Sequence, residues 1–198
     1  MPRTGLTPEA ARQRALDIAV ERIRTHGFAK LRLADVARDM GVSHAALYAH
    51  FSNKAALLDA VTGNWLAEAR LRMAAAGAGP GPAEARIEAW FLERYRLKSA
   101  RAKSDPEVFY GFMAATTGDR PVVRAHLELM TAALAELLAE AGLGGRDEAE
   151  MLEDSMAAFL HPALITSGPE PGREAALRRH LKVFLAGLAA LAAGPGSA

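Results

Sequence analysis

The chain has 198 residues, of which 51% are apolar and 24% are charged, and this ordinary globular composition excludes a wholly disordered protein. It contains no cysteine, which excludes disulfides, thiolate metal sites and thiol nucleophiles. The formal net charge is +1, but the first 60 residues carry nine basic and six acidic side chains. We therefore expect the N-terminal third to be the part of the chain that faces a polyanion.

Helix formers dominate the composition, because Ala and Leu abound while aromatic residues make up only 6% of the chain. Helix boundaries are also legible: Thr7, Ser43 and Asn53 are typical N-caps, and Gly27 and Gly41 end the helices before them. We predict an all-α fold of about nine helices, which span residues 8–26, 33–40, 44–50, 54–76, 83–103, 106–117, 121–141, 147–167 and 173–193.

Two short predicted helices, 33–40 and 44–50, are joined by the turn Gly41-Val42-Ser43. This arrangement predicts a helix-turn-helix, in which the second helix can lie in the major groove of DNA. Leu47 and Phe51 are four residues apart and should face the core. The outward side of the helix then carries His44, Ala45, Tyr48 and Ala49.

Here the sequence resembles the tetracycline-repressor (TetR) family of transcriptional regulators. The motifs that carry the resemblance are Gly27-Phe28, Val36-Ala37, Gly41-Val42-Ser43, Leu47-Tyr48-Ala49-His50-Phe51 and Lys54. The resemblance covers about 50 residues at the N-terminus, and a compatible number of helices follows. It implies that Tyr48 and the positions near His50 and Lys54 contact DNA phosphates, and that the residues after Ser43 meet base edges. It also implies a C-terminal domain that binds a small molecule.

The candidate DNA contacts have the chemistry that these roles require. His44 is a strong hydrogen-bonding group, and the methyl groups of Ala45 and Ala46 suit contact with the thymine methyl. Arg32 stands where a Ser or Thr usually caps the helix, so a phosphate or base contact can replace a cap worth ~1 kcal/mol. Two alternatives stay open: Tyr48 packs between helices, or His50 caps or packs. The predicted DNA-binding set is Arg32, Ser43, His44, Ala45, Ala46, Tyr48, His50 and Lys54.

The segment 77–82 (Gly-Ala-Gly-Pro-Gly-Pro) breaks the helical pattern. A phosphate-binding loop is disfavoured there, because no strand precedes it and two prolines remove N–H donors. We therefore expect four segments along the chain. They are a helix-turn-helix DNA-binding domain over 1–53, a connecting helix and loop over 54–82, a ligand-binding and dimerisation bundle over 83–193, and a disordered tail over 194–198.

Aromatic and methionine side chains are frequent in the expected bundle, where they belong to the core or line a ligand pocket. Pro162 lies inside the predicted helix 147–167 and should kink it, since the Ala158 carbonyl loses its N–H partner. The candidate residues for a largely apolar effector are Trp90, Tyr95, Phe109, Tyr110, Met113, Met130, Phe159 and His161.

Two runs of charge in the bundle are interpreted as solvated helix faces. Asp147, Glu148, Glu150, Glu153 and Asp154 begin a helix and complement its dipole, so we expect no metal site there. The basic run is spread around its helix, and capture of an anionic ligand is the alternative for it. That run comprises Arg94, Arg96, Lys98, Arg101 and Lys103. No cofactor is predicted.

The last two predicted helices carry more apolar side chains than one core needs, which predicts a helix pair that associates across a twofold axis. The candidate interface residues are Met156, Leu160, Leu177, Leu181, Phe184, Leu185 and Leu188. Such a homodimer would bind a palindromic site in double-stranded DNA, with half-sites about 34 Å apart in the shortest case.

These features together predict a ligand-responsive regulator, a repressor released from a palindromic operator by a small-molecule effector. Two other classes stay open: a DNA-binding or partner-binding protein without sequence specificity, since few side chains can read bases, and a helical-bundle enzyme with His161 as general base. No apolar run approaches the ~18 residues of a membrane span and no signal segment is present, so we expect a soluble, cytoplasmic protein.

Overall fold

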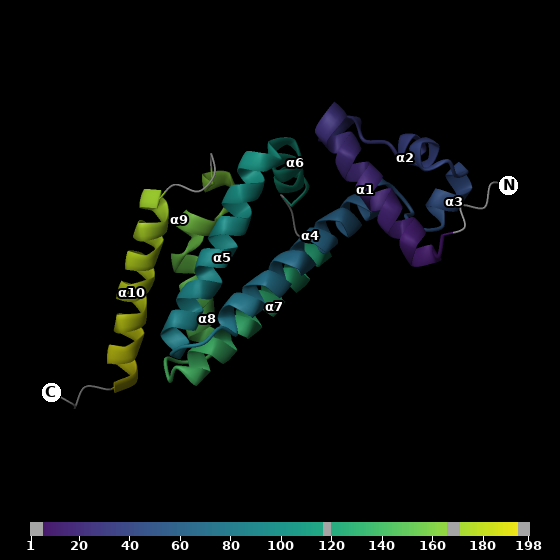
Figure 1. The fold of residues 1–198 in the computed structure, drawn as a ribbon. Helices are drawn as coiled ribbons and strands as arrows, with labels where there is room; N and C mark the ends of the chain where they lie inside the picture. Colours follow the sequence, from purple (N-terminus) through teal and green to yellow (C-terminus); the bar gives the residue numbers. More distant parts are fainter. Residues whose placement is uncertain (1–5, 117–119, 166–170, 194–198) are drawn as a thin grey trace. The chain divides into compact units, whose positions relative to one another are not determined.

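The computed structural model describes residues 6–116, 120–165 and 171–193, and side chains are not described at 112–116, 163 and 171. These residues form helices and no strand, so the all-α prediction is confirmed (Figure 1). The α-helices are α1 (Pro8–His26), α2 (Leu33–Met40), α3 (His44–Tyr48), α4 (Lys54–Gly77), α5 (Ala83–Ser104), α6 (Pro106–Thr116), α7 (Pro121–Glu140), α8 (Arg146–Ser155), α9 (Ala157–Leu160) and α10 (Pro171–Ala193). Two short 3₁₀ helices are η1 (Phe28–Lys30) and η2 (Pro162–Leu164).

The predicted N-caps of three helices are confirmed by hydrogen bonds. Thr7 Oγ1 accepts from the Ala10 N–H at 3.2 Å, and Ser43 Oγ accepts from the Ala46 N–H at 3.2 Å. Asn53 Oδ1 accepts from the Ala56 N–H at 2.9 Å. These bonds satisfy N–H groups that have no carbonyl partner in the first turn of a helix, and so they fix where α1, α3 and α4 begin.

The predicted helix 147–167 is wrong in its second half. α8 ends at Ser155, α9 follows as a single turn, and His161 adopts an extended conformation with ψ 124° before η2 begins. Pro162 therefore breaks the helix instead of kinking it, because the residue before a proline is driven out of the helical region. The guanidinium of Arg173 donates to the Ala158 carbonyl, the group that was expected to lose its partner.

By internal packing the chain forms two units, unit 1 (residues 1–65 and 105–122) and unit 2 (66–104 and 123–198). α4 passes from one unit into the other, and the boundary falls between Trp65 and Leu66. The predicted single bundle over 83–193 is wrong for α6, which packs on α1 and η1 in unit 1. A Cβ added at Gly111 of α6 would lie only 2.8 Å from the Phe28 side chain. The close approach of α6 to Phe28 therefore requires glycine at this position.

The core of unit 1 holds the helix-turn-helix in place. Ile23 of α1, Val36 of α2 and Leu47 of α3 are completely buried in one apolar cluster, which also includes Phe51. An ion pair joins α1 to Asp105, the buried residue just before α6. Arg24 donates through two nitrogens to Asp105 Oδ2, at 2.8 and 2.6 Å.

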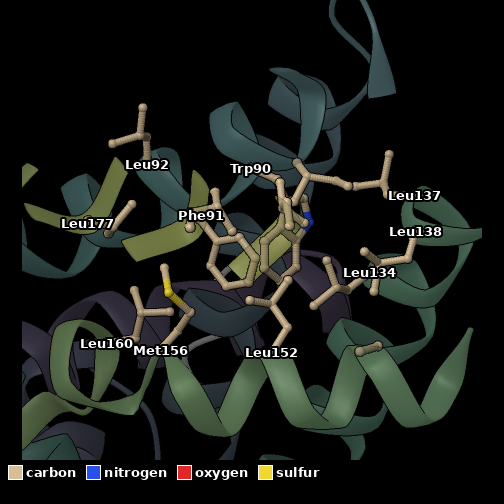
Figure 2. Packing of buried hydrophobic residues seen from close by; sticks show 14 of the residues in the cluster. Trp90, Phe91, Leu92, Leu134, Leu137, Leu138, Leu152, Met156, Leu160 and Leu177 are labelled. Atoms are coloured by element: carbon tan, nitrogen blue, oxygen red, sulfur yellow. The ribbon is translucent and has the colours of Figure 1, made fainter. Parts of the chain in front are cut away.

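The core of unit 2 is built around two neighbouring aromatic side chains of α5. The rings of Trp90 and Phe91 meet edge to face, with centroids 4.8 Å apart. Figure 2 shows Trp90 on the side of Leu134 and Leu137, and Phe91 on the side of Leu177 and Met156. α5 also packs on α9 and α10. It is therefore the helix around which the buried side chains of unit 2 are arranged.

A membrane-spanning segment is not found among the helices of the described residues, since each of them is too short or too polar for that purpose.

Replacing Gly111 by alanine should destabilise unit 1. The new methyl would lie 2.8–3.1 Å from three carbons of Phe28, a contact that outweighs the helix-propensity gain of about 1 kcal/mol, and we expect a net loss of about 1–2 kcal/mol in the free energy of unfolding. Gly63→Ala is the matched control, because the nearest neighbour of its Cβ is at 3.4 Å. Urea denaturation of both variants measures the effect, and equal stability of the two would contradict the packing described here.

Candidate nucleic-acid interface and ligand core

The outward face of α3 is exposed and carries mostly small side chains. Ser43, His44, Ala45, Ala46 and Ala49 are exposed, whereas Leu47 on the opposite side is completely buried. Exposed alanines place the backbone of a helix close to any surface that it meets. α3 ends at Tyr48, two residues before the predicted end, because residues 49–50 form a turn.

His44 and Tyr48 form a pair one helical turn apart on this face. Their rings meet edge to face with centroids 4.5 Å apart, and 44% of Tyr48 is exposed. The alternative in which Tyr48 is packed between helices is therefore wrong. His50 is half-buried and its ring lies 6.4 Å from that of Phe51, which keeps its packing alternative open.

Lys54 is anchored at the start of α4. Its ammonium donates to the Phe28 carbonyl at 3.2 Å and to the Ala29 carbonyl at 3.1 Å, and it lies 5.5 Å from the centre of the Phe28 ring. Two of the three ammonium N–H donors are used in this way, which leaves one for a phosphate oxygen. The lysine therefore positions the 28–30 turn as well as presenting a positive charge.

The acidic side chains of α2 are neutralised by arginines. Arg22 donates to Asp39 at 2.6 Å, and Arg38 donates to Asp35 at 2.6 Å. The hydrogen bond from Arg22 lowers the pKa of Asp39 below its ordinary value. Arg32, in contrast, is exposed at the N-cap position of α2 and makes no capping hydrogen bond there. Its charge is available to an anion.

The predicted ligand-binding residues fall in both units. Trp90, Tyr95, Met130 and Phe159 are buried together in the core of unit 2, and His161 is exposed. Phe109 and Tyr110 belong to unit 1, where Phe109 is buried and Tyr110 is 43% exposed. The side chain of Met113 lies outside the described residues. The structure thus brings four of the eight residues together.

The interpretation of the basic run on α5 as solvated is wrong for two of its members. Arg94 is 7% exposed and donates through one nitrogen to both carboxylate oxygens of Glu153, at 2.7 and 2.6 Å. Lys98, one turn later, donates to the Leu160 carbonyl at 2.6 Å, at the end of α9. Burial lowers the pKa of the Lys98 ammonium to about 7. Both side chains face the interior because they share a helix face with Trp90 and Phe91.

The acidic run at the start of α8 divides in the same way. Asp147, Glu150 and Asp154 are exposed, as predicted, but Glu153 points inward to Arg94. Within the ranges that the structure describes, no group of three or more His, Cys, Asp or Glu residues has the arrangement of a metal site.

Two further polar residues of unit 2 were missed by the sequence analysis. His126 of α7 is 8% exposed, and its Nδ1 lies 3.5 Å from the guanidinium of Arg70 on α4. Burial, together with the charges of Arg94, Arg70 and Lys98, lowers the pKa of His126 to about 3. One signal existed in the sequence: His126 shares an apolar helix face with Met130, Leu134 and Leu137.

The predicted dimer residues are used inside the protomer. Met156, Leu160, Leu177, Leu181, Leu185 and Leu188 are buried in the core of unit 2, and Phe184 packs against it. The apolar side chains that were predicted to be surplus are buried inside the protomer, where those of α10 pack against Trp90 and Phe91 of α5. Leu181 and Leu185 also reach an open groove of about 840 Å³ between α5 and α10, which Arg178 and Glu88 border.

Two family profiles match the chain. Residues 15–61 match the profile described as bacterial regulatory proteins of the tetR family, and residues 83–179 match that of the tetracyclin repressor-like C-terminal domain. The chain belongs to the TetR family of transcriptional regulators. The first profile contains the whole helix-turn-helix, and the second contains His126 and the ion pair between Arg94 and Glu153. No curated protein sequence gives a significant match.

Solved structures with similar folds include other regulators. The fatty acid degradation regulator FadR of Bacillus halodurans is 16% identical, with a TM-score of 0.68 over 92% of this chain and 97% of that one. A TetR/AcrR-family regulator of Thermobifida fusca is 21% identical, with a TM-score of 0.67 over 89% and 97%. A TetR-family regulator of Streptomyces coelicolor is 22% identical, with a TM-score of 0.65 over 92% and 91%. At these identities the likeness establishes the fold.

Replacing His126 by glutamine should change how stability depends on pH. Because the folded chain holds the pKa of His126 near 3, the unfolded chain binds a proton below about pH 6.5 that the folded chain does not. This group alone should lower the free energy of unfolding of the wild type by up to about 1.4 kcal/mol per pH unit as the pH falls. H126Q lacks this ionisable group. Its free energy of unfolding, measured by urea titration, should therefore increase relative to that of the wild type as the pH falls. A difference that is constant across pH would contradict the neutral, buried histidine.

Proposed function

We propose that this TetR-family regulator is a homodimeric repressor that binds a palindromic operator through α3 and is released by a largely apolar small molecule. The observation that carries the proposal is the open face of α3, where His44 and Tyr48 stand beside exposed alanines on a capped helix fixed to the core by Leu47. A helix of this shape can approach base edges closely.

Each side chain near α3 has a distinct role in this proposal. The His44 imidazole reads a base edge, and the methyl groups of Ala45 and Ala46 contact thymine. The Ser43 hydroxyl accepts the capping bond and keeps its own O–H for a phosphate. The Tyr48 hydroxyl, the His50 ring, the Arg32 guanidinium and the remaining Lys54 donor fix the register on the phosphate backbone.

The dimer is proposed to form through the outer face of α10. Val183 is 70% exposed and Leu191 is 75% exposed, and between them Gly187 and Ala190 are exposed on the same side of the helix. Apart from its two chain neighbours and the nearby backbone of α10 itself, no atom lies within 4 Å of the position of a Cβ on Gly187. Small residues between two larger apolar ones let a second copy of the helix approach closely, and removing this surface from water favours association.

The effector is proposed to occupy unit 2 near Tyr95, Met130 and Phe159. These side chains are buried around α5, and α5 packs on α9 and α10. A ligand that displaces α5 would also displace α10, the proposed dimer helix. Coupling free energies of about 1–3 kcal/mol between ligand binding and DNA binding are typical of such systems.

Selection of duplexes from random DNA should enrich a palindrome and separate the roles around α3. His44→Ala should lose preference at one base pair in each half-site, worth about 1–3 kcal/mol, while Arg32→Ala should weaken all sequences alike and lower the salt slope by about one. Arg146→Ala, an exposed change on α8, is the control and should behave as the wild type.

No enriched sequence from folded wild type, with binding that depends steeply on salt, would instead favour the alternative of DNA binding without sequence specificity. Equal losses on operator and random DNA for H44A and R32A would contradict the division of roles.

Replacing Val183 by arginine should dissociate the dimer. The charge would be buried without a partner in the α10 face, so sedimentation or light scattering should show a monomer at concentrations where the wild type is dimeric. Leu71→Arg is the matched control, because Leu71 is 74% exposed on α4 and lies outside the proposed interface. A dimer that persists in V183R, or one that dissociates equally in L71R, would place the interface elsewhere.

A further inference from the structure

The polar groups around the buried His126 of unit 2 carry an excess of positive charge. Arg70 of α4 and Arg94 and Lys98 of α5 all act on His126 of α7, and each of them lowers its pKa. Among the described residues, the carboxylate that interacts with this group is Glu153, which accepts both hydrogen bonds from Arg94. Arg94 is therefore compensated, while Arg70 and Lys98 have no carboxylate of their own in the same range.

Such an excess is unfavourable in the absence of an anion. An ammonium or guanidinium that is partly removed from water loses hydration that neutral hydrogen-bond acceptors restore only in part. Lys98 has a carbonyl as acceptor and Arg70 has a ring nitrogen. The lowered pKa of Lys98, about 7, expresses the same cost, since burial and the neighbouring Arg94 both favour the neutral amine.

The hydrogen-bonding capacity of the group is also incomplete. Because the Arg70 guanidinium can only donate, its contact with Nδ1 of His126 requires the tautomer that carries its proton on Nε2. That N–H is a donor for an oxygen of a ligand. Ser99, the residue after Lys98, is completely buried, and its hydroxyl has no hydrogen-bond partner.

We propose that unit 2 binds the carboxylate of its effector through Arg70, Lys98 and His126, beside the Arg94–Glu153 ion pair. This inference rests on the proposed function, which makes unit 2 the effector domain, and it adds the chemical class of the effector. One monoanion supplies the charge that Glu153 does not, and its two oxygens accept from donors on three helices, α4, α5 and α7.

The rest of the effector is apolar. One turn beyond His126 on α7 is Met130, and one turn before Lys98 on α5 are Arg94 and Tyr95, with Met130 and Tyr95 both buried in the core of unit 2. A molecule whose carboxylate lies at His126 would extend its body along these side chains. The ligand class is thus an amphipathic carboxylic acid with one charged end.

Calorimetric titration with three probes tests the site on the protein without DNA. Octanoate carries the proposed group, 1-octanol has the same chain without charge, and octyl phosphate carries the other common oxyanion. Octanoate should bind at least about tenfold more tightly than 1-octanol. In addition, binding at about pH 8 should take up as much as about one proton, because the anion favours protonated Lys98, and titration in buffers of different ionisation enthalpy measures this uptake.

Variants separate the site from general folding effects. Arg70→Gln should remove the preference for octanoate over 1-octanol, and Lys98→Gln should remove the proton uptake. Arg72→Gln and Arg96→Gln are the matched controls, since Arg72 pairs with Glu93 and Arg96 with Glu174 at the exposed surface of the same two helices. Both controls should keep the wild-type values. Arg70→Gln serves if Lys98→Gln fails to fold, because Arg70 caps no helix end.

The results distinguish this inference from the proposed function. Equal affinity for octanoate and 1-octanol, or a preference that survives Arg70→Gln, would overturn the carboxylate site, and binding of octyl phosphate alone would overturn the assignment to a carboxylate. Failure of the wild type to select a DNA sequence would overturn the proposed function without affecting these titrations. Tight octanoate binding that leaves an enriched operator bound would keep the site and remove its role as an effector switch.

Discussion

The buried ion pair between Arg94 and Glu153 is the constraint on which unit 2 depends. Arg94 lies on the same face of α5 as Trp90 and Phe91, so that face cannot be buried without burying the charge. Glu153 supplies the counter-charge from α8, and this fixes α8 against α5 in one register. Losing one partner of a buried pair typically costs about 3–5 kcal/mol, because the other charge is left uncompensated.

The consequences of that pair reach the rest of the unit. With α8 fixed, the chain must turn back at His161, where Pro162 ends the helix, and the Lys98 ammonium meets the last carbonyl of α9. α10 can then cover Phe91 with its leucines, which leaves its small residues outward. Arg94 and Lys98, the polar residues on this face of α5, also place positive charge near His126. The structural role and the proposed ligand-binding role therefore meet on one face of α5.

In unit 1, the packing must hold the five-residue helix α3 in a defined orientation. α3 is too short to be stable by itself, and its stability comes from the Ser43 cap and from Leu47 in the core. Lys54 secures the neighbouring 28–30 turn through two carbonyls. Arg22 and Arg38 neutralise the acidic side chains of α2, which removes negative charge from the part of the unit nearest to α3.

The sequence by itself determined most of the helices, the capping residues and the exposed face of α3, because these depend on interactions within a few residues. Thr7, Ser43 and Asn53 cap the helices that local rules predicted, and the alternation around Leu47 places His44 and Tyr48 outside. Only the tertiary structure decided which apolar and charged faces are covered. Leu177 and Leu181 look like a surplus until Trp90 and Phe91 are placed opposite them, and Lys98 looks solvated until α9 ends beside it. Burial depends on partners distant in the chain, and for this reason the excess charge around His126 is visible only after α4, α5, α7 and α8 are assembled.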